Sequence, residues 1–325
     1  MRPGFVPVIH AAVPDRPDEQ DTLDSAATVA AALLRIGHAA EVIDIGPRFL
    51  PLAGLAARSP LAVFNLVEAV EGDAGRAYLA IRHMERLGLP CTGAGAAATE
   101  LTGSKIRTKR LLAASGIPTP HWWESAEAPP AGLTVIVKPD TEHASFGIDA
   151  GSVVDGGQAR REIARREARF GGRFFAEAFV EGREFNVSLI EEADGPRVLP
   201  IPEIVFDLPQ GRPRIVDYEA KWDPASHAYH HTPRHFGVEA REPALAVELA
   251  GLSRACWTAA GLSGYARVDF RVDREGRPTV LEINTNPCIA PDAGFAATAA
   301  ASGISYDGLI ARIVAAVRVH VSAVT

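Results

Sequence analysis

The sequence has few cysteines, no long hydrophobic run and no excess of basic residues. Its three cysteines, Cys91, Cys256 and Cys288, are widely spaced and form no CxxC pair, which excludes a disulfide framework or a zinc ribbon and predicts a reducing, cytoplasmic location. No stretch approaches 18 uncharged apolar residues, so we expect no membrane span. With 33 Lys and Arg against 40 Asp and Glu, the net charge of −7 argues against a nucleic-acid-binding protein.

Two common phosphate-binding motifs are also missing. A Walker A loop requires GxxxxGK[ST], and Gly103–Lys105 has the wrong order. Gly93–Ala98 fits GxGxxA, but the acidic residue expected about 20 positions later is absent from Ala113–Gly116. A Rossmann cofactor site is therefore not expected. The histidines at 227, 230, 231 and 235 lack clean helical spacing and predict a pH-sensitive loop, with a zinc site as the alternative.

The chain does contain a strand and helix pattern whose character changes along its length. Its 325 residues suggest about two domains. In the first hundred residues, strands at Phe5–Ile9, Glu41–Ile45 and Leu61–Leu66 alternate with helices, which predicts a parallel sheet with helices on both faces. Further along, fewer helices separate the strands, which predicts α+β domains with antiparallel sheets. The strands expected there are Thr134–Lys138, Arg173–Val180, Glu184–Ile190, Arg197–Val205 and Ala266–Val272. Tyr306–Val321 has the pattern of an amphipathic helix.

The strongest local signal is a hairpin pattern between residues 265 and 287, with a glycine at its turn. Pairing the two strands symmetrically places Asp269 opposite Glu282, and Arg267 opposite Asn284. Because directly opposed residues share a face of the sheet, we expect all four polar groups on one face. The other face would then pack against a core through the apolar residues Val268, Phe270, Leu281 and Ile283.

The polar face of this hairpin is suited to a metal ion and a phosphoryl group. Two carboxylates, from Asp269 and Glu282, with the amide of Asn284 supply the oxygen ligands that Mg²⁺ prefers. The neighbouring Arg267 fits a group that stabilises charge on a transferred phosphoryl. The alternative is a solvated hairpin face with an ordinary cross-strand ion pair.

Two weaker signals also point to a nucleotide. Lys138 ends an apolar strand and can reach a phosphate as a point charge, unless it is an edge lysine with its stem on apolar surface. The following loop, Asp140–Gly147, could cover phosphates with its backbone amides. In Phe175–Glu184, the carboxylate of Glu177 among aromatic residues could seat a purine and its ribose. The alternative for that stretch is an ordinary strand–turn–strand.

Taken together and in this order, several motifs resemble those of the D-alanine–D-alanine ligases, a family of ATP-grasp carboxylate–amine ligases. The resemblance covers about residues 20 to 315, and the order of the motifs is more specific than any one of them. The motifs are Gly88-Leu-Pro-Cys-Thr-Gly93, Lys105 to Lys109, Gly116-Ile-Pro-Thr-Pro120, Val135-Ile-Val-Lys-Pro139, Glu177 to Glu184, Asp217-Tyr-Glu-Ala-Lys221, and Arg267 to Asn284.

The resemblance implies an α/β plus α+β architecture, the ATP-grasp fold. An N-terminal α/β domain with a parallel sheet (residues 1–102) would precede two α+β domains (103–180 and 181–325) that clasp ATP. The implied reaction transfers the γ-phosphoryl of ATP to a substrate carboxylate, and an amine then attacks the acyl phosphate to give an amide, ADP and phosphate. The resemblance further implies small amino-acid-like substrates and Mg²⁺, with two ions that Mn²⁺ can replace. We also expect a homodimer.

The resemblance assigns roles to particular residues. Arg267 would stabilise the acyl phosphate and the tetrahedral intermediate, and the implied catalytic set is Arg267, Lys221 and Ser145. The implied metal ligands are Asp269, Glu282 and Asn284. The implied ATP contacts are Lys105, Lys138, Glu177, Ala178, Phe179, Val180, Glu184, Lys221 and Leu281.

The sequence departs from the family pattern at the expected amino-acid site. Ala144 replaces a serine, Trp222 a tyrosine, Cys288 a glycine, and about Ala293 another serine. The family's N-terminal glutamate, which reads the first amino group, would correspond to Glu19, Gln20 or Asp21, and the substrate set is taken as Glu19, Trp222 and Cys288.

These departures predict an amide-forming ligase whose product is not D-alanyl-D-alanine. The alternatives are a genuine D-alanine–D-alanine ligase of peptidoglycan synthesis and an ATP-binding regulatory module without ligase turnover. We expect Asp217–Phe236 to act as a lid over the nucleotide.

Overall fold

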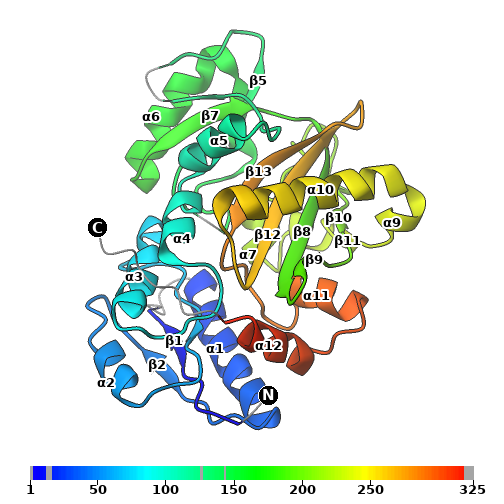
Figure 1. Ribbon diagram of the computed structural model, residues 1–325. Coiled ribbons are helices and arrows are strands. Elements are labelled where there is room, and N and C mark those ends of the chain that lie inside the picture. Colours follow the sequence, from blue (N-terminus) through cyan, green and yellow to red (C-terminus); the bar gives the residue numbers. More distant parts are fainter. Residues whose placement is uncertain (1–2, 12–16, 125–126, 143, 318–325) are drawn as a thin grey trace.

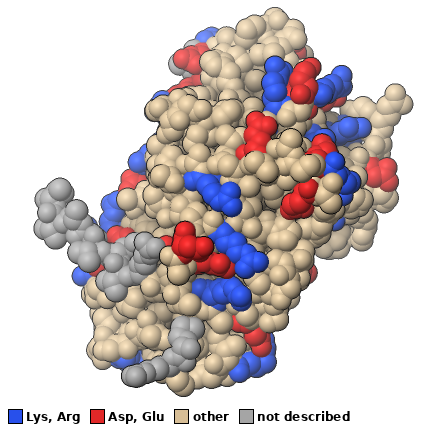
Figure 2. All heavy atoms as spheres, turned by 45° about the vertical axis from the view of Figure 1, so that its right-hand side comes forward, with Lys and Arg blue, Asp and Glu red and all other residues tan. Residues whose placement is uncertain are grey.

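The computed structural model describes residues 3–11, 17–124, 127–142 and 144–317. Three β-sheets organise this part of the chain (Figure 1), with the three-stranded sheet at the lower left, the four-stranded sheet at the top and the six-stranded sheet between them at the right. No helix in the described ranges is long and apolar enough to cross a membrane. On the face shown in Figure 2, acidic and basic side chains are interspersed, without one large basic patch.

The first sheet is parallel and has helices on both faces, as expected. Its strand order is β2-β1-β3, with β1 at Val8–His10, β2 at Val42–Asp44 and β3 at Phe64–Asn65. Successive side chains of β1 enter different cores: Val8 packs with α1 and α12, and Ile9 packs with α2 and α3. These and the neighbouring helices are α1 (Pro17–Arg35), α2 (Pro51–Ala57), η1 (Ala74–Arg76), α3 (Tyr78–Arg86), α4 (Ala96–Thr102) and α12 (Tyr306–Ala315).

The C-terminal helices return to this first sheet. Helix α12 packs along α1, and Arg35 and Asp307 join the two helices through an ion pair of 2.7 Å. Helix α11 (Gly294–Ala301) contributes Phe295 to the same core. The helix expected at Tyr306–Val321 begins at Tyr306 but ends at Ala315, and residues 318–325 lie outside the described part of the chain.

The second sheet is antiparallel, with strand order β4-β7-β5-β6. Helix α6 covers one face, where Ile163 meets Val135 and Val137 of β5. The elements are β4 (Trp122–Trp123), β5 (Thr134–Pro139), η2 (Ala150–Ser152), β6 (Val153–Asp155), η3 (Gly156–Gln158), α6 (Ala159–Phe170) and β7 (Phe174–Ala178).

The third sheet is also antiparallel, with order β11-β10-β8-β12-β13 and with β9 paired to β8. Helix α10 covers one face and buries Leu245, Leu249 and Cys256 in the largest core. Helix α5 (Lys105–Ala114) joins this core through Leu112. The remaining elements are β8 (Gly182–Glu192), β9 (Gly195–Val198), β10 (Glu203–Ile204), α7 (Tyr218–Trp222), α8 (His227–His230), β11 (Arg234–His235), α9 (Val238–Arg241), α10 (Pro243–Ala260), β12 (Tyr265–Asp273) and β13 (Pro278–Asn284).

Two differences from the expectation concern the third sheet and the helix that covers it. The single strand predicted over Arg197–Val205 is wrong, because the chain forms β9 and β10 with a break between them. Pro200 and Pro202 lie in that break, and proline cannot donate to a strand ladder. Helix α10 was not predicted, although its buried residues recur at the helical spacing of three and four along the 18 residues.

Candidate active site

A cavity of about 710 Å³ lies among the three sheets and collects nearly all the residues expected in the site. Its walls include β5 and β7 of the second sheet, and β8, β12 and β13 of the third. Every expected site residue lines it except Glu19, whose side chain lies outside the described part of the chain. The lining set comprises Lys105, Lys138, Ser145, Glu177, Ala178, Phe179, Val180, Glu184, Lys221, Trp222, Arg267, Asp269, Leu281, Glu282, Asn284 and Cys288.

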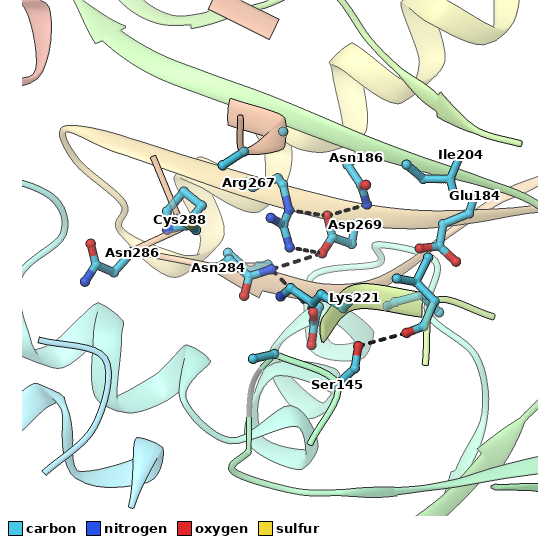
Figure 3. Close-up of a pocket in the computed structure, with 18 of the residues that line it drawn as sticks. Ser145, Glu184, Asn186, Ile204, Lys221, Arg267, Asp269, Asn284, Asn286 and Cys288 are labelled. Carbon is cyan, nitrogen blue, oxygen red and sulfur yellow. Dashed lines mark hydrogen bonds and ion pairs between the residues drawn. The ribbon is translucent and has the colours of Figure 1, made fainter. Parts of the chain in front are cut away.

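The hairpin of β12 and β13 forms the charged floor of this cavity. Arg267 pairs with Asn284, and Asp269 with Glu282, as the symmetric register predicts. Arg267 holds Asp269 in two parallel contacts, Nε to Oδ1 at 2.7 Å and Nη2 to Oδ2 at 2.8 Å. The amide of Asn186 on β8 donates to Asp269 Oδ1 at 2.8 Å, and Asn284 Nδ2 donates to Oδ2 at 3.0 Å (Figure 3). Burial raises the pKa of Asp269, and Arg267 opposes that shift.

These oxygen atoms fit a magnesium ion in number and kind. Asn284 Nδ2 bridges Asp269 at 3.0 Å and Glu282 Oε1 at 3.4 Å, so the three side chains converge on one spot. Rotation of an asparagine amide exchanges its nitrogen and oxygen. The rotated amide of Asn284 would add an oxygen ligand to those of the Asp269 and Glu282 carboxylates. Within the described ranges, no three His, Cys, Asp or Glu side chains form a metal-holding group, so the four histidines near residue 230 form no zinc site of that kind.

A bulge in the hairpin corrects one expectation. The register shifts between Asp269 and Phe270, so Phe270 pairs with Val280 and Leu281 has no partner of its own. An extra residue on one strand puts two neighbours on the same side. Leu281 therefore lines the cavity beside Glu282, and the expectation that it faces the core is wrong. Its position in the cavity is the one that the family resemblance implies.

A buried carboxylate between two lysines lies where the second sheet meets α5. Glu177 Oε1 is 2.5 Å from Lys138 Nζ, and Glu177 Oε2 is 2.6 Å from Lys109 Nζ. Burial would raise the pKa of Glu177, but the positive charges of Lys109 and Lys138 outweigh it and lower the pKa. Burial lowers the pKa of Lys109 to about 8, with Glu177 opposing. Two ammonium groups against one carboxylate leave this wall of the cavity positive, as an anionic ligand requires.

Lys105 connects this wall to the hairpin. Ser104 caps α5 by accepting a hydrogen bond from the Arg107 amide at 3.2 Å, and it donates to Asp140 Oδ1 at 2.8 Å. The cap sets Lys105 at the first turn, where its Nζ lies 3.4 Å from Glu282 Oε2 and donates to the Glu142 carbonyl at 2.5 Å.

The loop before β6 and the short helix α7 close another side. Ala144 and Ser145 have φ of 57° and 61°, a left-handed conformation that is strained for residues with a Cβ and concentrates at functional sites. Trp222 Nε1 donates to the Ala144 carbonyl at 2.9 Å, and Ser145 Oγ donates to the Val216 carbonyl at 2.8 Å. Asp217 caps α7, which points Lys221 into the cavity. Burial and then Arg267 lower the pKa of Lys221.

Glu184 stands at the opposite end of the cavity floor. It is paired in register with Arg271, whose Nη1 lies 3.4 Å from Glu184 Oε2. Burial raises the pKa of Glu184 to about 7, with the charges of Asp269 and Glu282 adding to the shift and Arg271 opposing it.

At the end of the cavity where the sequence predicts the amino-acid site, Asp21 of α1 lines the wall. Gln20 is exposed and donates to Asp24 Oδ1 at 3.0 Å. Cys288 Sγ donates to Asp21 Oδ2 at 3.2 Å. Burial raises the pKa of Asp21, and it raises the pKa of the Cys288 thiol to about 12.

Sequence reasoning missed several lining residues. Asn186 and Arg271 occupy alternate positions on strands whose neighbours were identified, so the period of two along β8 and β12 could have found them. Glu68 and Asp292 lie on connecting segments and Arg234 on the two-residue strand β11, and no local spacing marks them.

The chain is similar in sequence to D-alanine–D-alanine ligases. Residues 116–315 match the family model described as D-ala D-ala ligase C-terminus. The D-alanine–D-alanine ligase of Gloeobacter violaceus is 34% identical over 316 residues, covering 92% of this chain and 95% of that protein. The ligase of Gluconobacter oxydans is 35% identical over 287 residues, covering 86% of this chain and 88% of that one.

Solved structures agree with the sequence relatives in fold. The Bacillus anthracis D-alanine–D-alanine ligase complexed with ATP superposes with a TM-score of 0.75 at 20% identity, over 96% of this chain and 97% of that one. The protein is thus an ATP-grasp ligase, which confirms the expected fold and enzyme class. Within that class, the chain belongs to the D-alanine–D-alanine ligase family.

Proposed function

We propose that the protein uses ATP to join two molecules of D-alanine through a peptide bond. The observation that carries this proposal is one cavity that holds Arg267, Asp269, Glu282 and Asn284 with cations on its walls, in a chain 34% identical to a named ligase over 92% of its length. The relatives thus favour the alternative expectation, a genuine D-alanine–D-alanine ligase, over a different product.

The wall lysines and the hairpin would divide the work of phosphoryl transfer. Lys105 and Lys138 attract the phosphates of ATP, and Lys221 approaches the same centre from α7. Asp269, Glu282 and Asn284 would hold Mg²⁺, which when bound neutralises charge on the phosphate oxygens. Catalysis would then depend mainly on positioning and charge stabilisation.

The γ-phosphoryl of ATP would pass to the carboxylate of the first amino acid, releasing ADP. The amine of the second amino acid would then attack the acyl carbon, lose a proton and displace phosphate. Arg267 lies beside this centre with its guanidinium already oriented by Asp269, so it can stabilise negative charge as it develops. Asp21 would bind the ammonium group of the first amino acid, since a carboxylate is the natural partner of that group.

The ATP contacts, the three-domain division at 102 and 180, the homodimer and the cytoplasmic location stay predictions. Glu177 and Glu184, with the backbone of Ala178–Val180 and the side chain of Leu281, line the end of the cavity that would take the purine and ribose. The closure of Asp217–Phe236 is likewise a prediction. In the structure, this segment includes α7, α8 and β11 and contributes Lys221, Trp222 and Arg234 to the cavity.

The direct test supplies purified protein with ATP, Mg²⁺ and D-alanine alone. We expect phosphate release together with the dipeptide, detected by mass spectrometry and resolved by chiral chromatography. L-alanine serves as the matched control. ATP binding without any dipeptide, from D-alanine or from a broad panel of amino acids, would contradict ligase function.

A second candidate is a ligase that joins a different pair of amino acids. The observation that favours it is the contact between Cys288 and Asp21, together with Trp222 bonded to Ala144, in the part of the cavity where the family pattern is altered. A panel of D- and L-amino acids offered in pairs separates the two candidates. A mixed dipeptide formed faster than D-alanyl-D-alanine would favour the second.

A further inference from the structure

Arg271 is a buried cation that faces the cavity and that phosphoryl transfer does not require. It lies on β12 two positions beyond Asp269, on the same face, and is only 3% exposed. Its guanidinium sits between the rings of Phe179 and Phe206, with 5.5 Å to each ring centroid. Burying a guanidinium is costly unless its donors are satisfied, so its partners indicate what it does.

These partners come from separate parts of the chain. Arg271 Nε donates to the Val180 carbonyl at 3.2 Å, and Nη2 donates to the Arg214 carbonyl at 2.5 Å. Nη1 lies 3.4 Å from Glu184 Oε2. Val180 belongs to the linker of residues 179–181 that joins β7 to β8, and hence the second sheet to the third. Arg214 belongs to the segment of residues 206–217 that connects β10 to α7.

The 206–217 segment forms part of the cavity wall through Ile215 and Val216. Near its start, the Asp207 amide donates to the His231 carbonyl at 2.9 Å. Near its end, the Val216 carbonyl accepts from Ser145 at 2.8 Å. Arg271 contacts the segment at Arg214, and Phe206 packs on the same guanidinium. One side chain therefore connects this segment to the linker between the sheets.

We propose that Arg271 is a positioning residue that fastens the 206–217 segment to the 179–181 linker and so shapes the end of the cavity that takes the purine and ribose. The effect on ATP binding rests on the proposed function, whereas the contacts of Arg271 with the segment and the linker do not. A planar guanidinium supplies donors in several directions and stacks on aromatic rings, which a lysine ammonium does not. The same fork holds Glu184, so loss of Arg271 frees a carboxylate that lines the cavity.

Trypsin reports on this contact directly. The Arg214 carbonyl that accepts from Arg271 belongs to the peptide bond that trypsin cleaves, Arg214–Ile215, whereas Arg212 is followed by Pro213 and resists cleavage. A protease must pull its target out of the native contacts before cutting. We expect R271M to speed cleavage at Arg214–Ile215 by about tenfold or more, measured by mass spectrometry without nucleotide. R271K keeps the charge but loses the planar guanidinium, so its cleavage rate should lie between those of the wild-type protein and R271M.

Nucleotide measurements test the consequence. R271M should raise the Kd and the KM for ATP by about tenfold while kcat falls much less, because the chemical step uses other residues. R271K should recover part of the affinity, which a general loss of folding would not allow. Melting temperatures of both variants establish that they are folded under the assay conditions.

The matched control is R274M. Arg274 lies on the turn of the same hairpin and pairs with Glu181 of the same linker at 2.7 Å, but both side chains are exposed. An exposed ion pair contributes little, so cleavage and ATP affinity should stay at wild-type values.

An unchanged cleavage rate at Arg214–Ile215 in folded R271M and R271K would overturn the proposal. Faster cleavage with unchanged ATP affinity would overturn the positioning role. If the wild-type protein binds no ATP, the proposed function fails, and the cleavage comparison still decides whether Arg271 fastens the segment.

Discussion

The two ends of the cavity are built in different ways. At the end proposed to take the nucleotide, charged side chains stand on strands of two sheets and are held by buried partners, as Glu177 is by Lys109 and Lys138. At the amino-acid end, Asp21 comes from α1, while Cys288 and Trp222 come from a loop and the end of a short helix. The departures from the family pattern lie at this second end. Under the proposed function, strands would carry the chemistry, and helix ends and a loop would carry the specificity.

The largest effect is expected at Arg267, which lies where the two ends of the cavity meet. Replacing it with alanine should lower kcat by about 10²–10³-fold, because a preoriented donor to developing charge is lost. The KM for ATP should change much less. Steady-state phosphate release measures both, with R274A as an exposed-arginine control. An unchanged kcat would exclude the proposed role.

Asp21 tests the specificity end. D21N keeps the size of the side chain but removes the charge that would bind an ammonium group. We expect the KM for one amino-acid substrate to rise by about tenfold to a hundredfold, with the KM for ATP unchanged. Q20A is the matched control, because Gln20 is the exposed neighbour on the same helix. If D21N raised the KM for ATP as much as the KM for the amino acid, the division of the cavity into two ends would be contradicted.

Lys109 gives the nucleotide end a pH dependence of stability. Its folded pKa of about 8 lies below the ordinary value of 10.5. Between these values the unfolded chain binds more protons than the folded chain, so Lys109 makes stability rise with pH, by at most about 1.4 kcal/mol per pH unit. The free energy of unfolding, measured with urea between pH 7.5 and 10.5, should rise less steeply with pH for K109M than for the wild-type protein. Parallel curves for the two proteins would contradict this prediction.

Cys288 should give the smallest effect. C288G restores the residue of the family pattern and removes the contact to Asp21 at 3.2 Å. We expect the ratio of kcat/KM between two amino-acid substrates to change by only a few-fold, because one small group in a pocket discriminates weakly. The KM for ATP should not move. C288S, which retains a donor to Asp21, should behave like the wild-type protein, and a large change in that variant would argue against the contact.

The hairpin shows how far periodicity alone reaches. Alternation along two strands and a glycine turn were sufficient to pair Arg267 with Asn284 and Asp269 with Glu282. The same alternation failed at Leu281, because a bulge adds one residue and reverses the side from that point. The position of a bulge depends on how the strand packs against its neighbours, which the pattern within the strand does not contain.

The first turns of α1 show the opposite limit. The sequence left Glu19, Gln20 and Asp21 as candidates for the residue that reads the first amino group, with Glu19 taken into the substrate set. The direction in which a helix points its first turn depends on the sheet and helices packed around it, here the core shared by α1, α12 and β1. That packing places Asp21 in the cavity and leaves Gln20 exposed.

Thus the sequence by itself determined the family, the parallel sheet followed by antiparallel ones, and the polar face of the β12–β13 hairpin, because these follow from local spacing and the order of motifs. Only the tertiary structure decided the bulge at Leu281, the position of Asp21 in the cavity wall, and the contact of Arg271 with Val180 and Arg214. The contact between Arg271 and Val180 joins residues 91 positions apart. No local pattern encodes which distant carbonyl a buried guanidinium will meet.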